Sequence, residues 1–316
     1  MESTPGINPQ EINTEIEQRN LSLEIAQVIS SFYGLGEVDD VAKISTGLSN
    51  DNYFLRRKES DSAIHVVRVI KNYNQNLIVN EIYIQQLLKK HDVKSNYLLP
   101  NHKGEYIYSG KNVTAVISEK LLGDHPEEVT EVICTLVGKL LGKYHQFIDT
   151  LPHNNGEILL NPLNVKNHLS ALDESKERSR LFELFNSCSD LLDKNLPAGI
   201  IHGDLHRENL LVDKDQNIAV LDVEHSGQGI LILDIARSIA DLCRSGERLN
   251  KKKLHAFLNG YNTSRIITEL ELVSLYHAVG MSCVAVATWF YEHKYSKLGD
   301  IFTNIGFNEY KNIYEK

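Results

Sequence analysis

Three polar residues, Asp204, Asn209 and Asp222, lie in a stretch that otherwise consists of short apolar runs and turns. Transfer of a phosphoryl group needs a carboxylate that orients the attacking hydroxyl and accepts its proton. It also needs oxygen ligands for one or two Mg²⁺ ions that bridge the phosphates. Asp204 could perform the first task, and Asn209 with Asp222 could perform the second. These residue types at this spacing therefore fit phosphoryl transfer.

The chain around these residues predicts a loop that leads into a β-hairpin. Short apolar runs rich in branched residues surround it, as strands would: 198–201, 210–212 and 218–223. The polar segment 213–217 separates the last two runs and has the composition of a turn. Asp204 and Asn209 would thus lie on or beside the loop, and Asp222 would end the second strand of the hairpin.

The segment H-G-D-L-H-R-E-N, from His202 to Asn209, resembles the catalytic loop of protein kinases, which is followed by a metal-binding Asp on the next hairpin. Gly203 stands where a protein kinase usually has Arg, and D-V-E at 222–224 stands where it has D-F-G. This variant is similar to the superfamily of aminoglycoside phosphotransferases, choline kinases and type II homoserine kinases. Members of that superfamily phosphorylate small molecules on a protein-kinase-like fold. The resemblance covers nearly the whole chain from residue 21.

The resemblance implies an α+β, bilobal protein-kinase-like fold with a small β-rich N-terminal lobe and a larger, mostly helical C-terminal lobe. We expect a polar N-terminal tail at 1–20, a nucleotide-binding lobe at 21–121, and a catalytic and substrate-binding lobe at 122–316. The implied cofactors are ATP, or GTP in its place, and Mg²⁺.

In the first lobe, small hydrogen-bonding residues at 45–52 lie between two strand-like runs. Such a loop can fold over phosphates with its backbone N–H groups, although a plain polar hairpin has the same composition. The resemblance implies that the loop covers the nucleotide without the G-x-G-x-x-G of protein kinases. Gly47, Ser49 and Asn50 are the residues we expect to bind the nucleotide there.

The strand-like run 64–70 contains Arg68, at the place where protein kinases have the Lys that grips the nucleotide phosphates. Lys71 is the alternative, and it would point to the opposite face of the strand. A helix expected at 77–90 carries Glu81, which the resemblance pairs with Arg68. We also expect strands at 98–108 and 112–118.

Helical spacing of apolar residues predicts helices at 127–147, 169–194 and 230–243 of the second lobe. His145, near the end of the first, is interpreted as a packing or capping residue. Asp234, at the start of the last, resembles the Asp that holds the catalytic-loop backbone in kinase-like folds, whereas a simple helix N-terminal charge is the alternative. The glycine-rich segment 227–229 is predicted to be a flexible turn.

Composition limits the partners. The 33 Lys and Arg against 42 Asp and Glu give a formal charge of −9, which disfavours nucleic acid and favours a cationic substrate. The four Cys show no C-x-x-C spacing and predict a reduced, cytoplasmic protein. We expect no secretory signal and no membrane span.

The acceptor expected from the resemblance is a small hydroxylated molecule: an amino alcohol, a homoserine- or choline-like metabolite, a sugar or an aminoglycoside. The sequence leaves the oligomeric state open.

Two other functions stay open. A metal-dependent hydrolase could bind Zn²⁺ or Mn²⁺ with the acidic and imidazole side chains of this stretch, which are His202, His206, Asp222, Glu224 and His225. Gly203 and the apolar run before it favour a loop rather than the helix face on which two His four apart share an ion. A nucleotide-binding pseudokinase is the other alternative, although all three phosphoryl-transfer residues are present.

Overall fold

A computed structural model describes residues 21–44, 50–58, 63–71, 73–147, 151–152, 160–191 and 194–306. The chain forms two compact units: Met1–Lys71 with Leu99–Lys120, and Asn72–Leu98 with Leu121–Lys316. The expected boundary near residue 121 differs from this division at 72–98. The reason is packing, because Ile84, Leu87 and Leu88 of that segment belong to the larger hydrophobic core.

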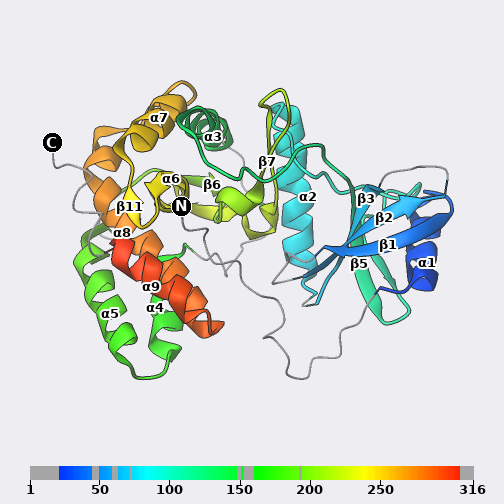
Figure 1. The fold of residues 1–316 in the computed structure, drawn as a ribbon, viewed down its shortest axis with the longest axis horizontal. Helices are drawn as coiled ribbons and strands as arrows, with labels where there is room; N and C mark the ends of the chain where they lie inside the picture. Colours follow the sequence, from blue (N-terminus) through cyan, green and yellow to red (C-terminus); the bar gives the residue numbers. More distant parts are fainter. Residues whose placement is uncertain are drawn as a thin grey trace. The chain divides into compact units, whose positions relative to one another are not determined.

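The first unit is an antiparallel sheet with a helix against it (Figure 1). The strands lie in the order β1-β2-β3-β5-β4. Their bounds, with those of helix α1, are α1 (Leu23–Tyr33), β1 (Val38–Ile44), β2 (Asp51–Arg57), β3 (Ala63–Val69), β4 (Tyr108–Gly110) and β5 (Val113–Glu119). Tyr53, Leu55 and Ile29 are buried together in its core.

Most of the strand expected at 98–108 is wrong, since only Tyr108 belongs to a strand, β4. The Asn101 side chain explains this difference. Its Oδ1 accepts hydrogen bonds from the backbone N–H groups of Lys103 (2.8 Å) and Glu105 (3.0 Å). These bonds close a turn on the backbone, which competes with strand pairing.

The second unit is mostly helical (Figure 1). Its helices are α2 (Gln75–Lys90), α3 (Glu131–Tyr144), α4 (Pro162–Ala171), α5 (Lys176–Cys188), α6 (Leu231–Leu242), α7 (Lys251–Asn262), α8 (Glu269–Glu292) and α9 (Ser296–Asn304). Short strand pairs complete it: β6 (Ala198–Ile201) with β9 (Gly227–Ile230), β7 (Leu210–Val212) with β8 (Ile218–Val220), and β10 (Arg244–Ser245) with β11 (Arg248–Leu249).

The helix expected at 169–194 is two helices, because the sequence supplies two helix starts. Asn161 caps α4 with its side chain, and Pro162 occupies the first turn, where its missing N–H costs nothing. Ser175 caps α5 by accepting from the Arg178 N–H.

Helices α3 and α7 pack with their backbones in close approach. A Cβ added at Gly138 would lie 2.1 Å from the Phe257 carbonyl oxygen, and one at Gly260 would lie 2.0 Å from the Thr135 carbonyl oxygen. No side chain fits at either position, so glycine permits this helix contact.

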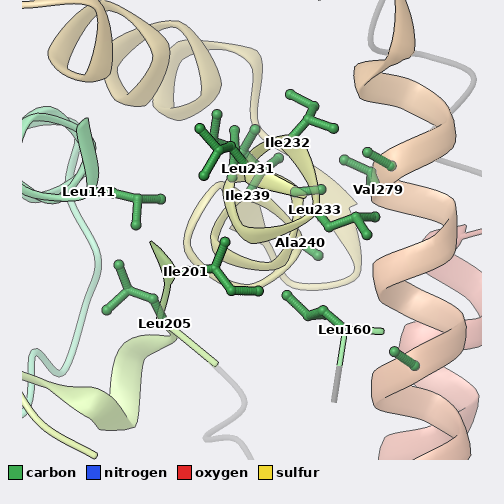
Figure 2. Packing of buried hydrophobic residues seen from close by; sticks show 14 of the residues in the cluster. Leu141, Leu160, Ile201, Leu205, Leu231, Ile232, Leu233, Ile239, Ala240 and Val279 are labelled. Carbon is green, nitrogen blue, oxygen red and sulfur yellow. The ribbon is translucent and has the colours of Figure 1, made fainter. Parts of the chain in front are cut away.

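Among the described residues, α8 is the one helix long and apolar enough to cross a membrane, and 72% of its apolar window is buried inside the structure. Such burial is the usual position of a core helix. Figure 2 shows Val279 of α8 facing α6, whose residues Leu233 and Ala240 lie in the same buried cluster. Ile201 and Leu205, which flank the loop at 202–204, belong to this cluster too. The loop is therefore anchored in the core at both ends.

Candidate active site

The predicted loop and hairpin are confirmed, but the second strand is shorter than expected: β8 ends at Val220, so Asp222 follows the strand instead of ending it. Strand β6 precedes the loop, and β7 and β8 pair antiparallel from Leu210↔Val220 to Val212↔Ile218. The flexible turn expected at 227–229 is wrong, since this segment is strand β9 paired with β6. Its glycine content serves close packing, because a Cβ at Gly229 would lie 2.4 Å from the Cδ1 atom of Ile201.

Asp234 of α6 holds the start of the loop by its backbone. Its Oδ2 accepts from the N–H of His202 at 2.7 Å, and its Oδ1 accepts from the N–H of Gly203 at 3.0 Å. Gly203 has φ +85°, a conformation that residues with a Cβ rarely adopt. This explains why glycine, and not the arginine of protein kinases, fits here. The structure has the anchoring contacts that the resemblance implied for Asp234.

Asp234 is itself held by a second buried side chain. His145, the cap residue of α3, places Nε2 2.9 Å from Asp234 Oδ2 and Nδ1 2.7 Å from the Tyr261 hydroxyl. Burial would raise the pKa of Asp234, but its contacts with His145 and His202 outweigh this effect and lower the pKa. His145 thus caps and packs, as the sequence predicted.

Asp204 lies in a charged setting at the end of this loop. Its Oδ1 accepts a 2.9 Å hydrogen bond from Nε of Arg237, and its Oδ2 lies 3.4 Å from Nε2 of His206. Burial opposes ionisation of Asp204, but the charges of His206 and Arg237 outweigh it and hold the pKa well below its ordinary value. The same pairing raises the pKa of His206 against the effect of its burial. Asp204 is therefore an ionised carboxylate at neutral pH, as a residue that receives a hydroxyl proton must be.

Asn209 is tied both to Asp204 and to the residue that follows the second strand of the hairpin, Leu221. Its Nδ2 donates to the backbone oxygen of Asp204 at 2.9 Å, which leaves the amide oxygen Oδ1 outside this contact. Its backbone oxygen accepts from the N–H of Leu221 at 2.9 Å. These bonds fix the distance between the loop and the residue that follows Leu221, which is Asp222.

Asp222 has φ +59° and ψ +49°, a left-handed conformation that non-glycine residues seldom adopt and that is enriched at functional sites. It starts the 3₁₀ turn Val223–His225. One ligand atom each from Asp222, Glu224 and His225 lies within 4.8 Å of the others. Carboxylate and amide oxygens are the ligands that Mg²⁺ prefers. Asp222 and Glu224 therefore offer carboxylate oxygens close enough to share a divalent cation, and Asn209 as a further ligand stays a prediction.

His202 does not fit the ligand set of the hydrolase alternative. Its Nε2 lies 3.0 Å from the Leu221 carbonyl oxygen, and its Nδ1 accepts from the Asp204 N–H at 3.3 Å, so both ring nitrogens are engaged. The side chain is fully buried, and burial lowers its pKa. His202 therefore braces the loop.

The residues predicted for the nucleotide fall in both units. Gly47 and Ser49 lie outside the described residues. The Asn50 Oδ1 atom accepts a hydrogen bond from the backbone N–H of Lys71 at 3.3 Å. Lys71 was the alternative to Arg68 as the residue that grips the phosphates, and its ammonium group forms an ion pair with Asp51 at 3.3 Å. Arg68 lies on the central strand β3, opposite Asn52 and Val116.

Glu81 lies on α2 in the second unit and is buried, with its Oε1 accepting from Gln85 at 3.2 Å. Its pairing with Arg68 stays a prediction.

Sequence reasoning missed Arg237 entirely. The available signal was its spacing, because a residue three positions after Asp234 lies on the same face of helix α6. Arg237 is 4% exposed, and arginine is seldom buried this deeply unless it is paired.

Comparison with known proteins places these features in context. A sequence model described as the phosphotransferase enzyme family (APH) matches residues 40–267. The homoserine kinase of Methylobacillus flagellatus is 25% identical over 261 residues, which cover 78% of each chain. The homoserine kinase of Neisseria meningitidis serogroup B is 24% identical over 257 residues, which cover 80% of this chain and 83% of the relative.

Solved structures share the fold. An amicoumacin kinase in complex with AMP-PNP and Ca²⁺ superposes with a TM-score of 0.71 at 13% identity, covering 90% of this chain and 92% of its own. A microcompartment-associated aminopropanol kinase superposes with a TM-score of 0.69 at 17% identity, covering 90% and 94%. The predicted kinase-like fold is confirmed.

Proposed function

Since the chain belongs to the phosphotransferase enzyme family and is a small-molecule kinase, we propose that it transfers the γ-phosphoryl group of ATP to the hydroxyl of a hydroxy amino acid, with homoserine as the first candidate. The observation that carries this proposal is the setting of Asp204, an ionised carboxylate held by Arg237 and tied through Asn209 to Leu221, the residue before Asp222. Homoserine is favoured because curated homoserine kinases match about four-fifths of the chain.

In the proposed reaction the acceptor hydroxyl oxygen attacks the γ-phosphorus. The bond from that phosphorus to the β–γ bridging oxygen breaks, and ADP leaves with the electron pair. Asp204 orients the hydroxyl and receives its proton, so that the attacking oxygen carries no positive charge in the product. Asp234 and His202 keep the loop backbone rigid, which holds the carboxylate in position for an in-line attack.

Asn209 and Asp222, with Glu224 beside them, would hold Mg²⁺. The ion supplies charge neutralisation on the phosphate oxygens when it is bound. Use of a nucleotide with a divalent cation is supported by the solved relative that contains AMP-PNP and Ca²⁺. Arg68 and Glu81 on the strand and helix, and Gly47, Ser49 and Asn50 in the segment before β2, are the proposed nucleotide contacts. We also propose that the protein acts in the cytoplasm, on a free metabolite.

A panel of acceptors tests this proposal. The purified protein is incubated with ATP and Mg²⁺ and with L-homoserine, choline, ethanolamine, 1-amino-2-propanol or spectinomycin, and phosphorylated products are identified by ³¹P NMR and mass spectrometry. We expect kcat/KM for L-homoserine to exceed that of the other acceptors by at least about tenfold, because a site built for one set of polar groups rejects analogues that lack them. O-acetylhomoserine, which lacks the free hydroxyl, should give no product.

A higher kcat/KM for choline or spectinomycin would replace homoserine as the acceptor. Phosphate transfer to none of these acceptors would contradict the proposed function.

A further inference from the structure

Helix α6 contacts every residue from His202 to Leu205 in turn. Asp234 accepts the N–H groups of the first two, Arg237 donates to the Asp204 carboxylate, and Ser238 donates to the carbonyl oxygen of Leu205 at 3.1 Å. One turn later, Asp241 Oδ1 accepts the N–H of Arg207 at 3.1 Å. Four side chains on one helix therefore set the position of the loop.

Arg237 differs from the other three because it alone contacts a side chain of the loop rather than its backbone. The Arg237 side chain is 5% exposed, whereas that of Asp204 is 21% exposed. The guanidinium therefore approaches the carboxylate from the protein interior, and the exposed part of the Asp204 side chain lies away from it. Figure 2 places α6 in the middle of the buried cluster, with Leu205 among its neighbours.

The contacts of Arg237 do not by themselves account for its burial. Its Nη1 is buried and, among the described residues, has no hydrogen-bond acceptor. The guanidinium carbon lies 5.9 Å from the centre of the Phe302 ring. An unpaired buried donor costs free energy, and well-packed apolar residues often replace buried ion pairs without loss. The stability of the core does not explain this residue.

The orientation of the Asp204 carboxylate explains the presence of Arg237 better. A carboxylate rotates about its terminal torsion with little restraint, so two oxygens compete to face a substrate. The Nε–H of Arg237 engages Oδ1 and stops this rotation, which leaves Oδ2 for the hydroxyl proton. His206 Nε2 lies 3.4 Å from Oδ2, a longer contact than the 2.9 Å hydrogen bond from Arg237 to Oδ1. Oδ2 is thus the less tightly held oxygen.

We propose that Arg237 is a positioning residue, which holds Oδ1 of Asp204 from the protein interior so that Oδ2 faces the acceptor hydroxyl. This inference rests on the proposed phosphoryl transfer and deepens it. Arg237 acts through Asp204 and does not touch the acceptor. Its removal should therefore lower kcat and leave the KM of both substrates nearly unchanged.

Arg237→Met is the first variant, and Arg178→Met is its matched control. The guanidinium carbon of Arg178 also lies over a phenylalanine ring, 5.4 Å from the centre of Phe182, and its Nε is buried without an acceptor among the described residues. Unlike Arg237, it donates to Ser170 and, in the part of the chain that the structure describes, contacts no residue of the loop. We expect Arg237→Met to lower kcat about 10²-fold, the cost of a misplaced catalytic group, with KM changed less than about twofold. Arg178→Met should keep the kcat of the parent.

A double-mutant cycle with Asp204→Asn separates positioning from a general structural effect. If Arg237 acts through Asp204, adding Arg237→Met to Asp204→Asn should lower kcat by less than about twofold further, because residues that act as a unit are not additive. Arg237→Lys, which keeps the charge in the core, serves if the methionine variant does not fold. It should lose most of the same activity because an ammonium lacks the planar geometry of a guanidinium.

The outcomes separate the two proposals. A parent-like kcat for Arg237→Met and Arg237→Lys, with Asp204→Asn inactive, would overturn the inference and leave the proposed function standing. An additive double mutant would overturn it equally. If the parent phosphorylates no acceptor in the panel, the proposed function fails, and a crystal structure of Arg237→Met decides the inference. An Asp204 carboxylate turned away from its parent orientation supports the inference, and an unchanged orientation overturns it.

Discussion

The substitution Asp234→Asn tests how the catalytic loop is held in place. The Asp234 carboxylate is completely buried and accepts the backbone N–H groups of His202 and Gly203 at 2.7 and 3.0 Å. Asparagine has nearly the same shape, but one of its two terminal atoms is a donor. That NH₂ group would face a backbone N–H and could not accept it, so one buried donor would lose its partner.

The size of the effect follows from these contacts. A hydrogen bond to a charged group contributes about 1.5–3 kcal/mol, and a buried donor without a partner costs about 1–3 kcal/mol. These terms overlap, so we expect Asp234→Asn to lower the free energy of unfolding by about 2–4 kcal/mol. A domain is typically stable by about 5–15 kcal/mol, so the variant should still fold. Its kcat should fall about 10²-fold because the loop shifts.

Urea unfolding followed by circular dichroism measures the loss, with Asp241→Asn as the control. Asp241 lies on the same helix and accepts one backbone N–H, that of Arg207 at 3.1 Å. The control should lose about 1 kcal/mol. Equal losses for the two variants, or a parent-like kcat for Asp234→Asn, would refute the view that Asp234 holds the loop.

Further predictions concern the metal, the pH dependence and the helix packing. Asp222→Asn, which tolerates the left-handed backbone, should raise the Mg²⁺ concentration for half-maximal activity at least about tenfold; an unchanged Mg²⁺ dependence would remove Asp222 from the ligands. Burial lowers the pKa of His202 below 6.5, so just below pH 6.5 this side chain is protonated in the unfolded chain but still neutral in the folded chain. The free energy of unfolding should therefore fall as pH drops below about 6.5, and this part of the fall, measured by urea unfolding at several pH values, should be absent in His202→Gln. Gly260→Ala should cost about 1–3 kcal/mol in the same assay, whereas the control Gly199→Ala, where a Cβ would make only one contact at 3.4 Å, should cost less; equal costs would contradict the close approach of α3 and α7.

Local pattern was sufficient for the loop, the hairpin and most helices. Strand runs and a polar turn identify the hairpin at 210–220, and the spacing of Asp204 and Asn209 depends on residues close in sequence. Capping residues such as Ser175 were also visible in the sequence, and weighing them would have divided the long helix expected at 169–194.

The features that the sequence did not predict depend on contacts between residues far apart in the chain. Segment 227–229 has the composition of a turn, yet it forms a strand because β6 offers a partner and Ile201 fills the space beside Gly229. Arg237 contacts a residue 33 positions earlier in the sequence, and its spacing from Asp234 indicates only a shared helix face and does not identify Asp204 as its partner. Helix α2 joins the larger unit because its apolar face packs there, which its own sequence does not reveal.

Single-turnover transfer of the γ-phosphoryl group from ATP to L-homoserine, compared between the parent and Asp204→Asn, tests the central claim most directly. Asparagine keeps the shape of the side chain but cannot receive a proton. We expect the rate of phosphohomoserine formation to fall at least about 10²-fold, as on loss of a general base, while the dissociation constant for Mg²⁺·ATP changes less than about twofold because Asp204 is not a metal ligand in this account. Parent-like formation of phosphohomoserine by Asp204→Asn would contradict the claim that this carboxylate receives the proton.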